Sequence, residues 1–453
     1  MARKVFISFL GTTNYVECRY DVNGAVSKPV RFIQEALIRH YCGDWTAEDR
    51  ILVFCTSAEK TGERGSLEIN WLDNGQGNAS TESEKIGLKH RLEDLKSELR
   101  LQPGVEMHEI QAGFSEEETW NIFEAVYSRL RSGDEIYFDV THAFRSIPLF
   151  SVVLFNYSKF MLGTRIATIQ YGAFEKLGAR KAKELPVEER IAPVIDLTNI
   201  ARLQEYNQIA SELKYFGKVK KLKDVIAGDS SALADKAIET LAEGIAELDE
   251  HIATINLREI KSGGFIKKFR QNLKKVTKSN VIDNPIKSIL AELNEETRDF
   301  VENDDCRNIE AAVNWTVRHD MLMQAYPLAV EYVIFRVSEE MKHLKPGYMT
   351  EQKFKLLVSS ILGMPQDDYE NSRWKEDVQR YSDIAEEIAD APLIGEIRPL
   401  YDPIREKRNM LAHARTLAYS KLKKGIPDII ECLAALNSSY RNYPSTINIE
   451  KNV

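Results

Sequence analysis

The sequence predicts an α/β N-terminal domain followed by an all-α C-terminal region. Two observations lead to this fold class. Short β-branched runs alternate with amphipathic segments over residues 1–200, whereas almost every periodic segment from Leu197 onward has helical spacing. The length of 453 residues also exceeds the size at which a single hydrophobic core stops growing, so we expect several domains.

Within the first domain, five runs rich in β-branched and aromatic residues are expected to form strands, namely Lys4–Leu10, Ile51–Thr56, Val105–Gln111, Glu135–Val140 and Arg165–Tyr171. Four segments with apolar residues three and four apart are expected to form helices, namely Pro29–Tyr41, Ile86–Leu99, Glu116–Arg131 and Phe144–Phe160. This βαβ series predicts a Rossmann-like fold, a mostly parallel sheet with helices on both faces. Ligands of such sheets bind beyond the carboxyl ends of the strands.

The helical half contains a basic run between Arg258 and Lys278, in which Gly263 and Gly264 are expected to interrupt the helix. We interpret the run as a solvated helix face or linker, with an RNA-contacting surface as the alternative. These features divide the chain into an α/β domain at residues 1–200, a helical connector at 201–300 and a helical domain at 301–453.

The composition argues against several classes of protein. Hydrophobic residues make up 43% and charged residues 29% of the chain, which is typical of globular domains. The apolar stretch at Ile147–Tyr157 is too short to span a membrane. The five cysteines have no Cys-x-x-Cys spacing, so we expect neither a disulfide framework nor a metal site, and we expect a reducing cytoplasm. The net charge of -8 confines any RNA contact to a local surface.

Two loops at the ends of predicted strands carry residues suited to an anionic, nucleotide-like ligand. The first loop comprises Gly11, Thr12, Thr13, Asn14 and Tyr15, and the second runs from Asp139 to Ser146 and includes Thr141, His142 and Arg145. Both loops are expected to face one crevice, where backbone N–H groups and hydroxyls hold phosphate, Arg145 adds a charge, and Tyr15 or Tyr171 stacks on a base. The alternative for each loop is a simple turn or a helix cap, with His142 as a structural histidine.

Near the C-terminus, Arg408 and His413 lie in a helical context after Pro403, which we place in the first turn. RNA cleavage without a metal needs a proton-transferring group and a cation that stabilises the phosphorane, and these two side chains supply both roles. Five residues apart, they lie about 140° around a helix from each other, so two copies across a dimer axis would enclose a phosphate better than one. Arg336 and His343 match the same loose spacing.

The paired N-terminal motifs resemble the CARF domain of CRISPR-associated type III accessory proteins. The matching segments are the strand that begins at Lys4 with the loop that follows it, and the later Asp-x-Thr-His-x-Phe-Arg-Ser motif. The resemblance implies a homodimer or higher homo-oligomer that binds a cyclic oligoadenylate activator. The implied ring contacts are Thr12, Asn14, Thr141, His142 and Arg145, with Ser57 as an additional candidate.

The C-terminal motif Arg408-Asn409-x-x-x-His413 resembles that of HEPN ribonucleases, and the Asn that follows the Arg separates it from the pair at Arg336. The resemblance implies a metal-independent endoribonuclease that cuts single-stranded RNA and leaves 2',3'-cyclic phosphates. His413 would handle protons, Arg408 would stabilise the phosphorane, and Asn409 would position the substrate. The basic residues expected to guide the RNA backbone are Arg415, Lys421, Lys423 and Lys424.

Two rival functions stay open at this point. The first is a binding module, in which the same sensor is joined to a helical domain that recruits a partner or DNA, and Arg408 and His413 are merely structural. The second is a ring nuclease, in which the N-terminal crevice degrades the messenger and Thr12, Thr13 or His142 is catalytic. All three functions place the protein in a prokaryotic cytoplasm and require no membrane and no catalytic cofactor.

Overall fold

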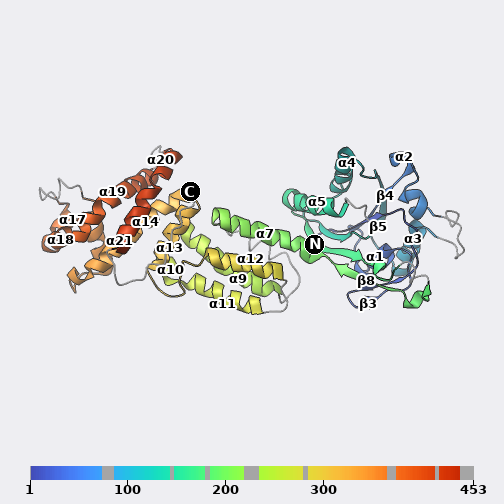
Figure 1. Ribbon diagram of the computed structural model, residues 1–453, viewed down its shortest axis with the longest axis horizontal. Coiled ribbons are helices and arrows are strands. Elements are labelled where there is room, and N and C mark those ends of the chain that lie inside the picture. The colour runs from blue at the N-terminus through green and yellow to red at the C-terminus, as the bar shows by residue number, and fades with distance from the viewer. Residues whose placement is uncertain are drawn as a thin grey trace. The chain divides into compact units, whose positions relative to one another are not determined.

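The computed structural model describes residues 2–73, 86–142, 147–178, 184–218, 234–278, 284–364, 374–413 and 418–438. The chain divides into two compact units, Met1–Gln204 and Glu205–Val453. The first unit is an α/β domain and the second is helical throughout its described residues, so the predicted fold class is confirmed (Figure 1). The finer division into a connector and a C-terminal domain stays a proposal.

The first unit is built on one eight-stranded sheet in the order β3-β2-β8-β7-β6-β1-β4-β5. Its strands are β1 (Lys4–Leu10), β2 (Arg19–Val22), β3 (Ala25–Val26), β4 (Arg50–Thr56), β5 (Gly104–Ile110), β6 (Glu135–Asp139), β7 (Arg165–Gly172) and β8 (Ile191–Asp196). The series β5-β4-β1-β6-β7 is parallel throughout, whereas β7 pairs with β8 and β2 pairs with β3 in antiparallel fashion.

The five predicted strands are present with ends that shift by one residue at most, but the sequence reading missed β2, β3 and β8. These three strands have four, two and six residues, and β8 includes Pro193. Strands β2 and β3 carry too few residues to display a period of two. Strand β8 is longer than β6, but its proline lowers the strand propensity of the segment.

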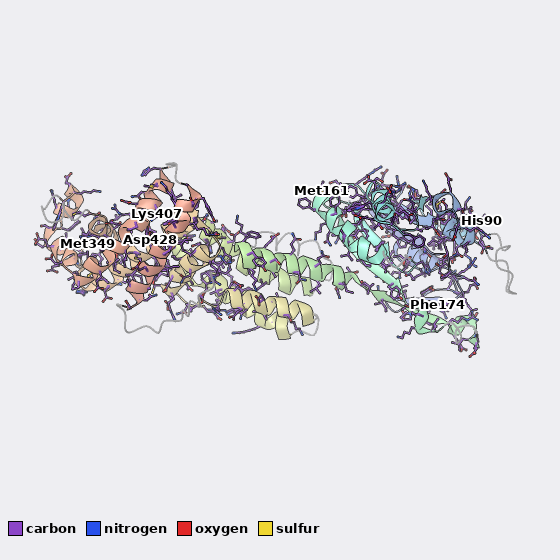
Figure 2. All side chains as sticks on the ribbon, turned by 45° about the horizontal axis from the view of Figure 1, so that its top comes forward. His90, Met161, Phe174, Met349, Lys407 and Asp428 are labelled. Carbon is purple, nitrogen blue, oxygen red and sulfur yellow. The ribbon has the colours of Figure 1, made fainter. Side chains whose placement is uncertain are left out.

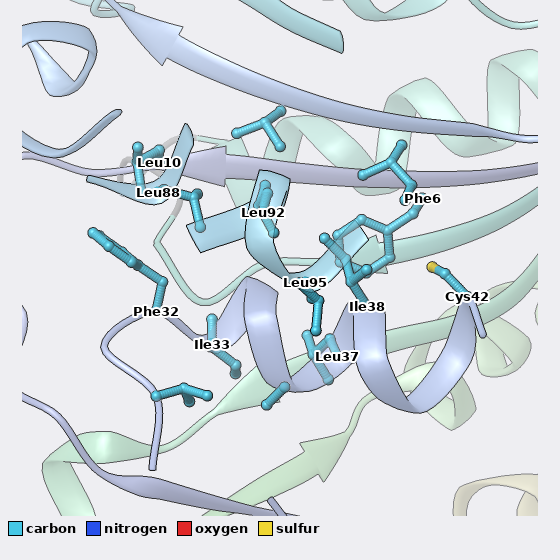
Figure 3. Packing of buried hydrophobic residues seen from close by; sticks show 14 of the residues in the cluster. Phe6, Leu10, Phe32, Ile33, Leu37, Ile38, Cys42, Leu88, Leu92 and Leu95 are labelled. Atoms are coloured by element: carbon cyan, nitrogen blue, oxygen red, sulfur yellow. The ribbon is translucent and has the colours of Figure 1, made fainter. Parts of the chain in front are cut away.

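Helices cover both faces of the sheet because β1 and β4 are apolar on both sides. Phe6 of β1 packs in one core with α1 (Ile33–Tyr41) and α3 (Leu88–Leu99), where the leucines of α3 lie over α1 (Figure 3). Ile7 of β1 packs in a second core with α4 (Glu116–Tyr127) and α5 (Ile147–Leu162). Alternate residues of one strand therefore serve opposite layers, as in a doubly wound sheet.

The remaining elements of the first unit are short: α2 (Ala58–Thr61), η1 (Leu67–Trp71), η2 (Phe174–Lys176) and η3 (Val187–Glu189). Helix α7 (Thr198–Phe216) contains the boundary between the two units.

The second unit consists of α9 (Ala234–Ala253), α10 (Leu257–Ser262), α11 (Gly264–Lys278), α12 (Asn284–Glu296), α13 (Arg307–Arg318), α14 (Leu322–Glu340), η4 (Met341–Leu344), α15 (Glu351–Leu362), α17 (Glu376–Gln379), α18 (Ser382–Ala389), α19 (Pro392–Ala412), α20 (Tyr419–Lys424) and α21 (Ile426–Ser438). Gly263 has a positive φ of 65° and separates α10 from α11, so the predicted helix break is confirmed. Helix α14 is the centre of the C-terminal bundle, with Tyr326, Leu328 and Tyr332 fully buried as expected of a core helix.

The start of α19 corrects the sequence reading. The helix begins at Pro392, with Pro399 and Pro403 inside it, so Pro403 is not in the first turn. An internal proline removes a backbone hydrogen bond and normally ends a helix. Here the stripe Ile394, Ile397, Tyr401 and Ile404 is buried in the bundle, and this burial offsets the lost hydrogen bonds.

No helix in the described part of the chain is long and apolar enough to cross a membrane.

Candidate functional site

The two predicted ligand loops lie together at one edge of the sheet. Strand β1 pairs in parallel with β6, with Ser8 opposite Asp139, so both strands end on the same side. A Cβ atom on Gly11, just after β1, would lie 2.6 Å from the Tyr15 hydroxyl oxygen and 3.1 Å from the backbone oxygen of His142. Only glycine fits this approach of the two loops. The described part of the second loop, up to His142, therefore lies at the same edge as the first loop, and the shared crevice stays a prediction.

Tyr15 and His142 face each other across this edge. Their ring centroids lie 4.0 Å apart, and the other side of Tyr15 contacts Phe32 at 5.4 Å. Burial raises the pKa of the Tyr15 hydroxyl to about 12 and lowers the pKa of His142 to about 3, so both side chains are neutral near pH 7. The Nε2 atom of His142 is enclosed and has no hydrogen-bond partner among the described residues.

Asp139 holds the second loop from beneath. Its carboxylate accepts hydrogen bonds from the Ser8 hydroxyl at 2.7 Å and from the Thr141 N–H at 2.9 Å. Gln34 in turn donates to the Ser8 hydroxyl at 2.9 Å. Asp139 is fully buried and has no ion-pair partner in the described ranges, so burial raises its pKa despite these hydrogen bonds. Thr141 also accepts the Gly172 N–H through its hydroxyl at 2.8 Å.

The other predicted contacts differ in how accessible they are. Thr12, Thr13 and Asn14 are exposed in the first loop. Ser57 is 1% exposed, and its hydroxyl both donates to Glu109 at 2.7 Å and caps α2. Arg145 lies outside the described residues. The role of each as a ligand contact stays a prediction.

Asn70 is a supporting residue that the sequence reading missed. It is 0% exposed in η1, a π-helical turn, and its side-chain amide donates to the Gly11 carbonyl at 2.8 Å and to the Thr13 carbonyl at 3.0 Å. Arg31 donates to the side-chain oxygen of Asn70 at 3.3 Å and to Asp73 at 3.0 Å. These bonds turn two carbonyls of the first loop toward the protein, and π-helical turns are frequent at functional sites.

The predicted nuclease residues lie at the C-terminal end of α19. Arg408 continues the buried stripe of Tyr401 and Ile404 and is half-buried, and its charge acts on the buried Tyr401 hydroxyl. Asn409 and His413 are four residues apart and therefore share a neighbouring face, with His413 exposed at the helix cap. Arg408 thus lies on the bundle side of the two polar residues.

The cations around Arg408 on α19 all have partners. Arg405 donates to Asp402 at 2.9 Å, Lys407 forms an ion pair with Asp428 at 2.8 Å, and the buried Arg398 donates to the Ile361 carbonyl. In contrast, the side chains of Arg408, Asn409 and His413 form no hydrogen bond or ion pair with other described residues. Arg408 and Asn409 are half-buried and His413 is exposed, and their catalytic roles stay predictions.

The second match to the loose Arg–His spacing is structural. Arg336 is 6% exposed in α14 and donates to the Cys306 sulfur at 3.3 Å. His343 lies in η4 with its Nδ1 3.0 Å from the Glu340 carbonyl. The two residues belong to different elements, and one is enclosed in the core. The described residues also contain no group of three or more His, Cys, Asp or Glu side chains that could hold a metal ion.

Comparison with known proteins gives one sequence match. Over 176 residues the chain is 29% identical to CRISPR-associated protein MJ1674 of Methanocaldococcus jannaschii. The aligned segment covers 37% of this chain and 26% of that protein. The chain is similar to a CRISPR-associated protein. The resemblance to CRISPR-associated proteins found in the sequence is thus confirmed, although the match spans about a quarter of the relative.

No family model matches the chain. Among solved structures, Enterococcus italicus Csm6 bound to cyclic hexa-2'-fluoro-hexa-dAMP aligns with 97% of this chain and 93% of that chain, with 14% sequence identity and a TM-score of 0.45.

Proposed function

We propose that the protein is a cyclic oligoadenylate-activated endoribonuclease of type III CRISPR antiviral defence, which cuts single-stranded RNA in the prokaryotic cytoplasm without a metal. One observation carries the nuclease half of this proposal. The three side chains that the chemistry requires are unpaired among the described residues, while the neighbouring cations of α19 have partners.

In the proposed reaction, His413 moves the proton of the attacking 2'-hydroxyl or of the leaving oxygen. Arg408 stabilises the charge that develops on the phosphorane, and Asn409 positions the phosphate. The 2'-oxygen attacks the adjacent phosphorus, the 5'-oxygen leaves with a proton, and the product carries a 2',3'-cyclic phosphate. None of these steps uses a metal.

The proposed activator site is the edge where Gly11 meets His142. The first loop offers backbone N–H groups and the hydroxyls of Thr12 and Thr13, of which Thr13 also hydrogen-bonds Tyr15. Tyr15 adds an aromatic surface for a base. Because the side chains of Tyr15 and His142 are neutral, the negative charges of the cyclic oligoadenylate phosphates would be met by backbone dipoles and by Arg145.

A homodimer of the first unit is part of the proposal. Helices α4 and α5 and the turn before α4 expose large apolar side chains, including Phe114 at 87%, Trp120 at 61%, Phe160 at 82% and Met161 at 52% (Figure 2 labels Met161 near the end of α5). Exposed apolar side chains in such number are typical of an interface between chains. Phe114 and Trp120 follow the carboxyl end of β5, at the same edge of the sheet as the activator site, so a second copy that packs there would bring two activator sites close together.

In such a dimer, ring binding would favour one arrangement of the two copies and bring both His413 side chains into productive geometry. This activation is a population shift, which requires that the ring bind the active arrangement more tightly than the inactive one.

The test is cleavage of a fluorogenic single-stranded RNA in EDTA with cyclic tri-, tetra- or hexa-adenylate. We expect one ring size to elicit cutting, and His413→Ala to abolish it. His343→Ala is the matched control because it removes an exposed histidine of the same unit that has no proposed role. If no ring elicits cutting, or if His413→Ala cuts as fast as the wild type, the nuclease proposal is wrong. Degradation of the added cyclic oligoadenylate, measured by chromatography, would instead support the ring nuclease.

A further inference from the structure

Helix α20 presents one aromatic ring and three lysines to solvent. Tyr419 is 56% exposed, and Lys421, Lys423 and Lys424 are all exposed. Leu422 is 6% exposed and faces the bundle together with the buried Gly425. Around the helix axis, Lys423 lies about 40°, Lys424 about 140° and Lys421 about 160° from Tyr419, so the four side chains span an exposed arc of about 200°.

Helix α20 packs on α21, which in turn packs against α19, the helix that carries the proposed nuclease residues (Figure 1). The Leu422 carbonyl accepts a hydrogen bond from the Tyr326 hydroxyl at 2.7 Å. A Cβ atom on Gly425 would lie 2.4 Å from Lys407, the residue before Arg408, and Lys407 is held by Asp428 (Figure 2 labels both). Since six chain steps separate His413 from Tyr419, their Cα atoms lie no more than about 22 Å apart.

The charges of this surface favour an anionic partner. Lys423 forms an ion pair with Asp320 at 3.0 Å, but Lys421 and Lys424 form no ion pair with any described residue. Stacking rings flanked by cations bind single-stranded nucleic acid, because the ring takes a base and the cations take phosphates.

We propose that α20 binds the single-stranded RNA next to the scissile phosphate, with Tyr419 stacked on a base and Lys421 and Lys424 on the backbone. The inference rests on the proposed nuclease function and names the surface that positions its substrate. The RNA would cross the exposed face of α20 from the ring to the lysines. Because the ring stacks on any base, it sets the register of the strand without specifying a sequence.

The first measurement is fluorescence anisotropy of a labelled single-stranded oligoribonucleotide on the full chain in the His413→Ala background, which prevents cutting. Tyr419→Ala should weaken binding by roughly 5- to 150-fold, the range that loss of one stacked base predicts. Tyr419→Phe and Tyr419→Trp should restore it. Tyr348→Ala is the matched control, because Tyr348 is 78% exposed in the same unit but not on α20.

A second measurement separates the lysines from the ring. Each of Lys421→Ala and Lys424→Ala should lower the slope of log K against log salt by about 0.7 for single strands, whereas Tyr419→Ala should leave the slope unchanged. In the ring-activated cleavage assay with His413 intact, Tyr419→Ala should raise KM and leave kcat unchanged.

The outcomes distinguish this inference from the proposed function. If Tyr419→Ala binds RNA as tightly as Tyr348→Ala, the inference is wrong even when the wild type cuts RNA. If no ring elicits cutting but Tyr419→Ala still weakens RNA binding, α20 is an RNA-binding surface and the nuclease proposal fails.

Discussion

Replacing Gly11 by alanine tests the proposed activator site with a single methyl group. The added Cβ would lie 2.6 Å from the Tyr15 hydroxyl oxygen and 3.1 Å from the His142 carbonyl oxygen. Both neighbours are packed, so they can give way only at a cost. The Tyr15 ring is packed between His142 at 4.0 Å and Phe32 at 5.4 Å, and the His142 backbone is tied through Thr141 to Asp139.

The expected cost follows from this crowding. An extra methyl in a well-packed site typically costs about 1–3 kcal/mol, which corresponds to roughly 5- to 150-fold in a binding constant. Without ligand, the exposed first loop can shift and relieve part of this strain. A bound ring would require the original arrangement, so the loss should appear mainly in ring affinity.

The assay is isothermal titration calorimetry of the full chain with the ring that elicits cutting. Gly104→Ala is the matched control, because a Cβ on Gly104 at the start of β5 would meet no atom within 4 Å. We expect Gly11→Ala to bind roughly 5- to 150-fold more weakly, while Gly104→Ala binds as the wild type does. Equal affinities for the two variants would refute the placement of the ring at this edge.

Three further predictions concern the same unit. Burial lowers the pKa of His142 to about 3, below its value of about 6.5 in the unfolded chain. Between these two pH values the unfolded chain binds more protons than the folded protein, so stability falls as the pH drops. The His142→Gln variant should therefore lose less thermal stability between pH 7 and 5 than the wild type, and equal losses would contradict the burial of His142. The Asn70→Ala variant leaves the carbonyls of Gly11 and Thr13 without the hydrogen-bond donor that Asn70 supplies. It should lower the free energy of unfolding by about 1–3 kcal/mol and weaken the binding of the cyclic oligoadenylate. An unchanged affinity in calorimetry would show that Asn70 does not support the site. Phe160→Glu places a charge on the exposed apolar face and should shift the protein to monomers in sedimentation velocity, whereas a persistent dimer would mean that another face joins the copies.

The central strands β1 and β4 could be predicted from the sequence because they have seven residues each and are apolar on both faces. β1, β4 and β6 each carry five to seven residues, enough for a strand pattern to stand out between helical segments. The strands β2 and β3 at the sheet edge have too few residues for such a pattern. The start of α19 was misplaced for a different reason, since local rules end a helix at proline, whereas burial of Tyr401 and its neighbours keeps this one continuous.

The two loops of the candidate activator site could be predicted from the sequence, whereas the residue that supports the first loop from within the protein could not. Gly11 and His142 could be brought together from the sequence, because parallel strands place their carboxyl ends at one edge and both residues directly follow such strands. Asn70 could not, because its hydrogen bonds to the first loop bridge 57 and 59 residues and no spacing rule connects them. An asparagine within an apolar segment is the only local signal, and burial gives it meaning only once the fold is known.

The acid–base properties of the first unit bear on which half of the chain performs chemistry. A general acid or base works best when its pKa lies near the operating pH. Burial moves the pKa of Tyr15 to about 12 and that of His142 to about 3, and Asp139 is enclosed in hydrogen bonds to Ser8 and Thr141. This edge of the sheet is therefore better suited to hold a ligand than to transfer its protons, which weighs against the ring nuclease. His413 is exposed at the end of α19 with its side chain unbonded among the described residues, so the second unit is the better place to look for proton transfer.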